Sequence, residues 1–349
     1  MKKIIASAAA LVLLFTCLSM LSGCTSSDKQ KLYIFNCGDY IGENVIAEFE
    51  EQYPQYTVYY DMFDSNEEMY QKLVSSGIPY DVVIPSDYMI ERLAKEGRLN
   101  EIDMSKLTNY DKIDANFKGR AYDPDEKYSV AYMWGTLGII YNTKKVSETV
   151  DSWNILWDEK YKGNILMLDS QRDALGLSLK RLGYSMNSTS EKEINEARDA
   201  LLAQKALVAD WGVDTLKESM YKGLYALSIA YAGDAYFMMD LNEDLDFVVP
   251  KEGSNLFVDA MVMPTTGKNK EGAYHFIDFM CSTEIAKENA EYINYSTPQT
   301  EALAQLDPEM RESPVYNPPK DVIDRCETFV DLGDALKLYN AAWEKVRLA

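Results

Sequence analysis

The chain has 349 residues, of which 47% are hydrophobic and 12% aromatic, so it can bury a large core and is long enough for two domains. Its formal net charge is -21, and without the two lysines at positions 2 and 3 the chain keeps 33 basic and 56 acidic residues, a charge of -23. Such a charge repels nucleic acid and anionic lipid and concentrates cationic solutes, although acidic surfaces mostly serve solubility. The composition therefore argues against a nucleic-acid-binding protein.

The first residues have the pattern of an export signal. Two lysines precede an apolar run over residues 4–20, which is short beside the roughly 20 residues of a spanning helix. The sequence Leu21-Ser22-Gly23-Cys24 that follows resembles the lipobox of bacterial lipoproteins. This resemblance implies a signal peptide at 1–23, lipid on Cys24, and a polar tether over 24–30 that holds the protein at the outer face of the cytoplasmic membrane. A plain signal peptide, with a periplasmic protein, and a single membrane anchor are the alternatives.

The cysteines do not form a disulfide or metal-binding pattern. Cys17 lies in the signal, Cys24 is the lipidation candidate, and Cys37, Cys281 and Cys326 remain in the body without any C-x-x-C spacing. Three is an odd number, so at least one thiol stays unpaired, and the simplest expectation is that none is paired.

Strand and helix patterns alternate over residues 32–88. Strands are predicted at 32–35, 57–60 and 81–84. A helix begins near Val45 and ends before Pro54, and a second follows Ser65, which forms a capping box with Glu68. This order builds a parallel sheet that binds ligands at the carboxyl ends of its strands. Residues 36–40 and 85–88 lie at two such ends.

The alternation starts again after Trp134-Gly135, which indicates a second α/β domain. Strands are predicted at 137–141, 165–168, 207–209, 225–231, 246–249 and 256–263, and helices at 192–202, 273–280 and 335–346.

The sequence lacks the common catalytic motifs. His275 is the only histidine and lies among aromatic residues, where a structural role is expected rather than a zinc site or a catalytic triad. No G-x-S-x-G, H-E-x-x-H, phosphate-loop or G-x-G-x-x-G motif is present. A carboxylate pair of the glycosidase type stays open among 56 acidic residues. We therefore expect no metal and no cofactor, and no enzyme, with a carboxylate-dependent hydrolase as the alternative.

Several segments at predicted strand ends form a series that resembles one protein family. They are 33–40 (YIFNCGDY), 81–88 (DVVIPSDY), 132–135 (YMWG), 153–163 (a W-x-x-L-W run ending in YKG), 248–253 (VVPKEG), 259–264 (DAMVMP), 268–273 (KNKEGA) and 295–298 (YSTP). In order and spacing they resemble the spermidine/putrescine-binding components of bacterial polyamine ABC transporters, over nearly all of the mature chain.

The resemblance implies an α/β protein with the two-lobed, type II periplasmic-binding-protein fold. Each lobe would be a mixed, mostly parallel sheet flanked by helices, with the ligand in the cleft between the lobes. Residues 31–136 and 259–304 would form lobe 1, and 137–258 and 305–349 lobe 2. The protein would act as a monomer that captures putrescine or spermidine and delivers it to the permease subunits of an ABC transporter.

The resemblance also implies a ligand site for an amine that arrives as a dication or trication, because its pKa is about 10. Asp259 would take one terminal ammonium and Asp173 another, while aromatic faces cover the methylene groups. The residues that match the family's site are Asp39, Tyr40, Ser86, Tyr88, Asp173, Tyr231, Asp234, Phe257, Asp259 and Tyr295.

The chain departs from the family at several of these positions. Cys37-Gly38 stands where the family usually has tryptophan followed by serine or threonine, and Tyr231 and Phe257 replace tryptophans. Because these side chains are smaller than tryptophan, the length of the ligand stays open. Asp234 after Gly233 resembles the putrescine-selective branch of the family. Another small solute in the same fold, such as a quaternary amine, a sugar or a metal ion, is the alternative. A carboxylate-dependent surface hydrolase and an adhesive lipoprotein rank below it.

Overall fold

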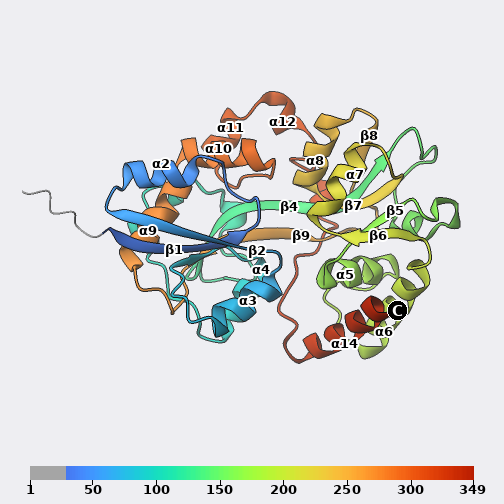
Figure 1. Ribbon diagram of the computed structural model, residues 1–349, viewed down its shortest axis with the longest axis horizontal. Coiled ribbons are helices and arrows are strands. Elements are labelled where there is room, and N and C mark those ends of the chain that lie inside the picture. The colour runs from blue at the N-terminus through green and yellow to red at the C-terminus, as the bar shows by residue number, and fades with distance from the viewer. Residues whose placement is uncertain (1–28) are drawn as a thin grey trace, which may run out of the picture.

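The computed structural model describes residues 29–349, which form two lobes side by side (Figure 1). The predicted signal at 1–23 and the lipidation candidate Cys24 lie outside the described residues. Strands of the described chain follow the order β2-β1-β3-β9-β4-β7-β5-β6, with β8 beside β4. The fold prediction of a two-lobed mixed α/β protein is confirmed.

Lobe 1 begins with the predicted alternation of strands and helices. Its elements are β1 (Gln30–Cys37), α2 (Val45–Gln52), β2 (Tyr56–Phe63), α3 (Asn66–Ser75), β3 (Val82–Val83) and α4 (Asp87–Lys95). β1 lies between β2 and β3 and is parallel to both, so the carboxyl ends of the strands share one edge. Ser65 caps α3 by accepting a hydrogen bond from the backbone N–H of Glu68, as predicted.

Lobe 2 repeats the parallel arrangement. Its elements are β5 (Ile165–Leu168), α5 (Gln171–Arg181), α6 (Glu191–Gln204), β6 (Val208–Gly212), α7 (Lys217–Tyr221), β7 (Leu227–Tyr231), α8 (Ala232–Leu241), β8 (Leu245–Val248) and α14 (Leu336–Leu348). β5 is parallel to β6 and β7. The first turn of α5 follows β5 and the first turn of α8 follows β7, so both turns lie at the same edge of the sheet.

The remaining helices follow β9 in the chain, and short 3-10 turns occur in both lobes. They are the helices α9 (Lys270–Met280), α10 (Thr283–Ile293), α11 (Thr300–Gln305), α12 (Pro308–Glu312) and α13 (Lys320–Ile323), and the short 3-10 turns Met104–Lys106, Tyr110–Lys112, Ala115–Phe117, Trp153–Trp157, Glu159–Tyr161, Asp214–Leu216 and Gly333–Ala335. His275 of α9 stacks on Tyr53 with ring centroids 4.8 Å apart, and its Nδ1 lies 2.9 Å from the Tyr56 hydroxyl.

One strand serves both lobes. β4 (Ser129–Asn142) pairs with β9 (Leu256–Val262) along its first half and with β7 and β8 along its second. The predicted strand at 137–141 thus begins eight residues earlier, because the apolar run continues through Trp134-Gly135 instead of ending there. Gly135 is needed at the crossing, since a Cβ there would lie 2.8 Å from the Phe257 ring.

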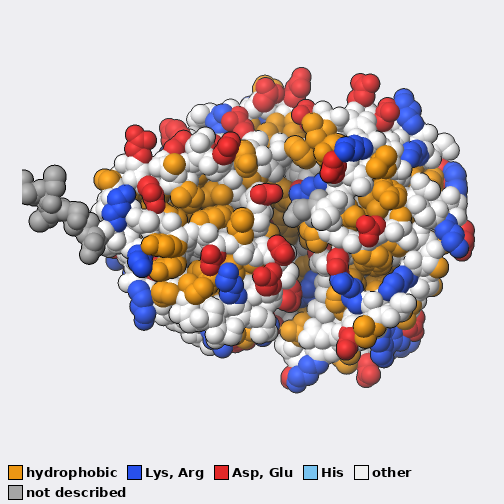
Figure 2. Space-filling view, viewed as in Figure 1, with side chains coloured by type: hydrophobic (Ala, Val, Ile, Leu, Met, Phe, Trp, Pro, Cys, Tyr) orange, Lys and Arg blue, Asp and Glu red, His pale blue; other side chains and the backbone are white. Residues whose placement is uncertain are grey.

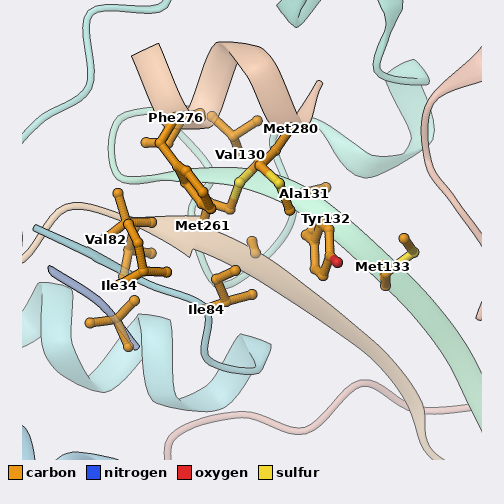
Figure 3. Packing of buried hydrophobic residues seen from close by; sticks show 14 of the residues in the cluster. Ile34, Val82, Ile84, Val130, Ala131, Tyr132, Met133, Met261, Phe276 and Met280 are labelled. Atoms are coloured by element: carbon orange, nitrogen blue, oxygen red, sulfur yellow. The ribbon is translucent and has the colours of Figure 1, made fainter. Parts of the chain in front are cut away.

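Each lobe has its own core. In lobe 1, Phe276 and Met280 of α9 pack with Met261 of β9, Val130 of β4 and Ile34 of β1 (Figure 3). A separate cluster in lobe 2 joins β5, β7, α5, α6 and α14. No described helix has both the length and the apolar character that crossing a bilayer requires.

The lobe boundaries stay a prediction, and core packing near residues 256 and 316 favours a larger lobe 1. Leu256 and Val258 belong to the lobe 1 core, as do Leu306, Met310 and Tyr316. These contacts favour assigning all of β9, and the chain as far as Tyr316, to lobe 1.

Candidate ligand-binding site

Asp259 of β9 lies between two hydroxyl groups of lobe 1. The Tyr40 hydroxyl, from the turn after β1, donates to Oδ2 at 2.7 Å, and the Ser86 hydroxyl at the start of α4 donates to Oδ1 at 2.6 Å. Residues 86 and 259 also form a backbone bridge. Asn66 fixes Ser86 in turn, with two hydrogen bonds of 3.0 Å to its backbone N–H and hydroxyl. Backbone pairing and side chains together therefore hold this carboxylate in place.

Burial dominates the electrostatics of Asp259. It raises the pKa of the carboxyl to about 6, although the hydrogen bonds from Ser86 and Tyr40 favour the charged form. A buried carboxylate without a cation is costly, so a bound cation would stabilise it.

Asp173 in the first turn of α5 is the corresponding acid of lobe 2. Its Oδ2 accepts hydrogen bonds from Ser170 at 2.6 Å and from the Tyr231 hydroxyl at 2.8 Å. Its Oδ1 is buried and has no hydrogen-bond partner in residues 29–349. Burial raises the pKa of this carboxyl as well, against the effect of those two bonds. An oxygen in this state can accept a hydrogen bond from a ligand ammonium group.

A row of four aromatic rings joins the two acids. Tyr40 contacts Tyr295 with ring centroids 5.2 Å apart, Tyr295 contacts Phe257 at 6.0 Å, and Phe257 contacts Tyr231 at 5.5 Å. The row ends in the hydroxyls bonded to Asp259 and Asp173. We call Tyr40, Tyr295, Phe257 and Tyr231 the aromatic row.

Tyr88, which is predicted to wall the same ligand, lies outside the aromatic row and contacts Phe329 and Arg172. It contacts Phe329 at 6.1 Å, and the Arg172 guanidinium lies 4.9 Å from its ring centre. Its hydroxyl donates to Glu67 at 3.0 Å. Arg172 also lies 4.3 Å from the Phe329 ring, so this group links α4 of lobe 1 with α5 of lobe 2.

The two remaining predicted acids differ in their surroundings. Asp39 is exposed, in a left-handed turn with φ 47°. Asp234, in the first turn of α8, forms an ion pair with Lys217 at 2.6 Å. Tyr295 lies beside Asp234, and burial followed by the charge of Asp234 raises the pKa of its hydroxyl well above its usual value.

The space-filling view shows the surface hollowed between the two lobes, with acidic side chains around the hollow (Figure 2). Carboxylates joined by aromatic faces suit a ligand with cationic ends and an apolar middle. Among residues 29–349, no group of three or more His, Cys, Asp or Glu side chains could hold a metal ion.

Sequence reasoning missed Arg172, Asn66, Lys217 and Asp87. Asp87 is fully buried, and its carboxylate accepts hydrogen bonds from the backbone N–H groups of Tyr88 at 2.7 Å and Val258 at 3.1 Å. It therefore ties the start of α4 to β9 beside the ligand site. An acid next to Ser86, at the start of an amphipathic helix, was the signal available for it.

Asp87 makes the stability of the protein depend on pH. Burial raises its pKa to about 8, whereas an unfolded chain has an aspartate pKa of about 3.9. The folded state then binds more protons between these values, so stability falls as the pH rises towards 8. We expect the free energy of unfolding to fall from pH 6 to pH 8 in the wild type and to change much less in Asp87→Asn.

Chemical denaturation at the two pH values measures this difference. Asp246→Asn, which removes an exposed acid, is the matched control and should keep the wild-type fall. Equal pH dependence in Asp87→Asn and the wild type would contradict the assignment.

The comparisons with known proteins place the chain in a family. The family model for bacterial extracellular solute-binding proteins matches residues 44–317. The spermidine/putrescine-binding periplasmic protein of Salmonella typhimurium is 34% identical over 329 residues, 94% of either chain. The putrescine/cadaverine-binding protein of Pseudomonas aeruginosa is 30% identical, over 96% of this chain and 99% of that one.

Solved structures show the same likeness. A putative spermidine/putrescine ABC transporter protein from Listeria monocytogenes has a TM-score of 0.89 and 38% identity, over 92% of this chain and 99% of that chain. The chain thus belongs to the family of bacterial extracellular solute-binding proteins. The resemblance carried by the sequence motifs is confirmed.

Proposed function

We propose that this protein is an extracytoplasmic solute-binding protein that captures polyamines and delivers them to the permease of an ABC transporter, without catalysis. The observation that carries the proposal is the aromatic row, which runs from the tyrosine bonded to Asp259 to the tyrosine bonded to Asp173. Relatives that cover more than nine tenths of the chain are named for binding spermidine, putrescine or cadaverine.

In the bound state, each terminal ammonium would face one carboxylate and the methylene chain would lie along the rings. Charge-assisted hydrogen bonds are about twice as strong as neutral ones, and a desolvated cation over an aromatic face gains about 2 kcal/mol. Since Asp259 comes from lobe 1 and Asp173 from lobe 2, a ligand that binds both acids would hold the lobes together. The ten predicted site residues remain a proposal. Of these, Asp39 is exposed and Tyr88 lies outside the aromatic row.

Thermal unfolding tests the function directly. The purified protein, unfolded and refolded to remove bound amine, is titrated with putrescine, spermidine, glycine betaine and ferric citrate. A ligand at a hundredfold excess over its Kd stabilises the folded state by about 2.7 kcal/mol. We expect a saturable rise in Tm with a polyamine; a rise only with betaine or ferric citrate would contradict the proposal.

The affinity for polyamine should fall in acid. The ligand binds the charged form of Asp259, whose pKa is about 6, while the amines stay protonated up to a pH of about 10. Affinity is therefore full above pH 7 and is lost as the pH falls through 6. From pH 8 to pH 5 the Kd should rise about tenfold, since roughly one molecule in eleven then carries the charge. Calorimetric titration measures this, and a constant Kd would exclude the role of Asp259.

We also propose that lipid on Cys24 holds the protein at the outer face of the cytoplasmic membrane. Two acyl chains anchor stably where a single one does not. Incorporation of labelled palmitate, and its loss in Cys24→Ala, tests this anchor. Monomeric behaviour is part of the same proposal, and sedimentation tests it.

A further inference from the structure

One carboxylate beside the aromatic row already binds an ammonium group that belongs to the protein. Lys217 Nζ lies 2.6 Å from Oδ1 of Asp234, and both side chains are largely buried, with 27% and 15% of their surface exposed. Lys217 begins α7 and Asp234 lies in the first turn of α8, so backbone on both sides fixes the pair.

The pair lies directly against the ligand site. Gly233, the neighbour of Asp234, is so close to Tyr295 that a Cβ there would come within 2.0 Å of its ring. Tyr295 is the ring that contacts both Tyr40 and Phe257 in the aromatic row. The Lys217 ammonium is thus held next to the middle of the row.

The charges left for a ligand are then those at the two ends. The hydrogen bonds that Asp259 accepts from Tyr40 and Ser86, and Asp173 from Ser170 and Tyr231, all come from hydroxyl groups. The charge of Arg172 also acts on Asp173 and lowers its pKa, but burial outweighs it. Asp39 is exposed, so water and salt screen its charge. Glu67 accepts a hydrogen bond from the Tyr88 hydroxyl, outside the aromatic row.

We infer that Lys217 takes the place of a third ammonium beside Tyr295 and so makes the site selective for diamines over triamines. A diamine leaves the Lys217–Asp234 pair intact. A triamine brings a further cation towards Lys217, which repels it, or must displace Lys217 from Asp234. The inference rests on the proposed function and adds the chain length of the ligand to it.

Calorimetric Kd values for putrescine, cadaverine and spermidine test the inference in the wild type, Lys217→Met and Lys222→Met. Lys222 is the matched control, because it directly follows α7 and pairs with Glu218 at the surface. We expect the wild type to bind a diamine at least tenfold more tightly than spermidine. Lys217→Met should lower that ratio about tenfold, since a bond to a charged group contributes at least this factor. Lys222→Met should keep the wild-type ratio.

Tighter binding of spermidine by the wild type, or an unchanged ratio in Lys217→Met, would overturn the inference and leave the proposed function standing. Failure to bind any of the three amines would overturn the proposed function itself. If Lys217→Met does not unfold cooperatively, Asp234→Asn decides. It removes the carboxylate but keeps the lysine charge, so spermidine should lose more affinity than putrescine. An equal loss for both would overturn the inference.

Discussion

Replacing Asp259 by asparagine should weaken polyamine binding about thirtyfold or more while the protein stays folded. The change keeps the side-chain volume but removes the charge that faces the ligand ammonium, and losing one partner of a buried charge pair costs about 2–5 kcal/mol. The pKa of about 6 means that burial opposes the charged form, so the neutral side chain should not lower the stability of the ligand-free protein at pH 7. Calorimetric titration gives the Kd, and thermal unfolding gives the stability.

Asp246→Asn is the matched control for this experiment. Asp246 on β8 accepts a hydrogen bond from the Tyr141 hydroxyl at 2.7 Å, as Asp259 does from Tyr40, but it is exposed. Asp246 pairs with Tyr141 near the end of β4, whereas the crossing at Gly135 lies in the part of β4 that pairs with β9. This variant should bind polyamine like the wild type. An Asp259→Asn variant with near-wild-type affinity would show that the ligand binds elsewhere.

Replacing Gly233 by alanine should have the next largest effect. An added Cβ would lie 2.0 Å from the Tyr295 ring, so the ring must leave its place between Tyr40 and Phe257. The helix itself would gain from alanine, by up to about 1 kcal/mol, whereas overpacking costs about 1–3 kcal/mol. We therefore expect a modest loss of stability and a loss of polyamine affinity of about tenfold or more, through the missing cation–π contact.

A double-mutant cycle separates this mechanism from a general disturbance of α8. In a Tyr295→Ala background the added methyl group has no ring to displace, so Gly233→Ala should cost no further affinity. Additive losses in the two variants would refute the mechanism, as would wild-type binding by Gly233→Ala alone.

The predictable parts of the fold are those in which local pattern and tertiary role coincide. The strands around Leu32 and Val82 are buried on both faces and follow one another as unbroken apolar runs. Ser65 and Glu68 mark the start of α3 because the cap is a local contact. β4 was predicted too short, because Trp134-Gly135 resembles a break. There the glycine makes room for Phe257, a residue 122 positions away, which no local pattern reveals.

The candidate site also contains residues that the sequence predicts and residues that it does not. Asp259 stands out in the sequence because an acid between apolar residues of a strand needs partners, yet those partners come from other loops, and Tyr40 is 219 positions away. Arg172 gave no signal, because a charged helix residue is normally exposed, whereas aromatic rings cover this one. The Lys217–Asp234 pair depends on how two neighbouring helices meet. The sequence therefore predicts Asp234 as a ligand residue but gives no sign of its ion pair with Lys217.

The return of the chain to both lobes also determines when during synthesis the protein can fold. Met310 and Tyr316 belong to the core of lobe 1, whose first strand begins at Gln30, and Val346 of α14 belongs to that of lobe 2. A ribosome makes about 5–20 residues per second, and a domain folds as a unit. Neither lobe can complete its core until nearly the whole chain has been made. We therefore expect the nascent chain to stay loosely structured until its synthesis is nearly finished.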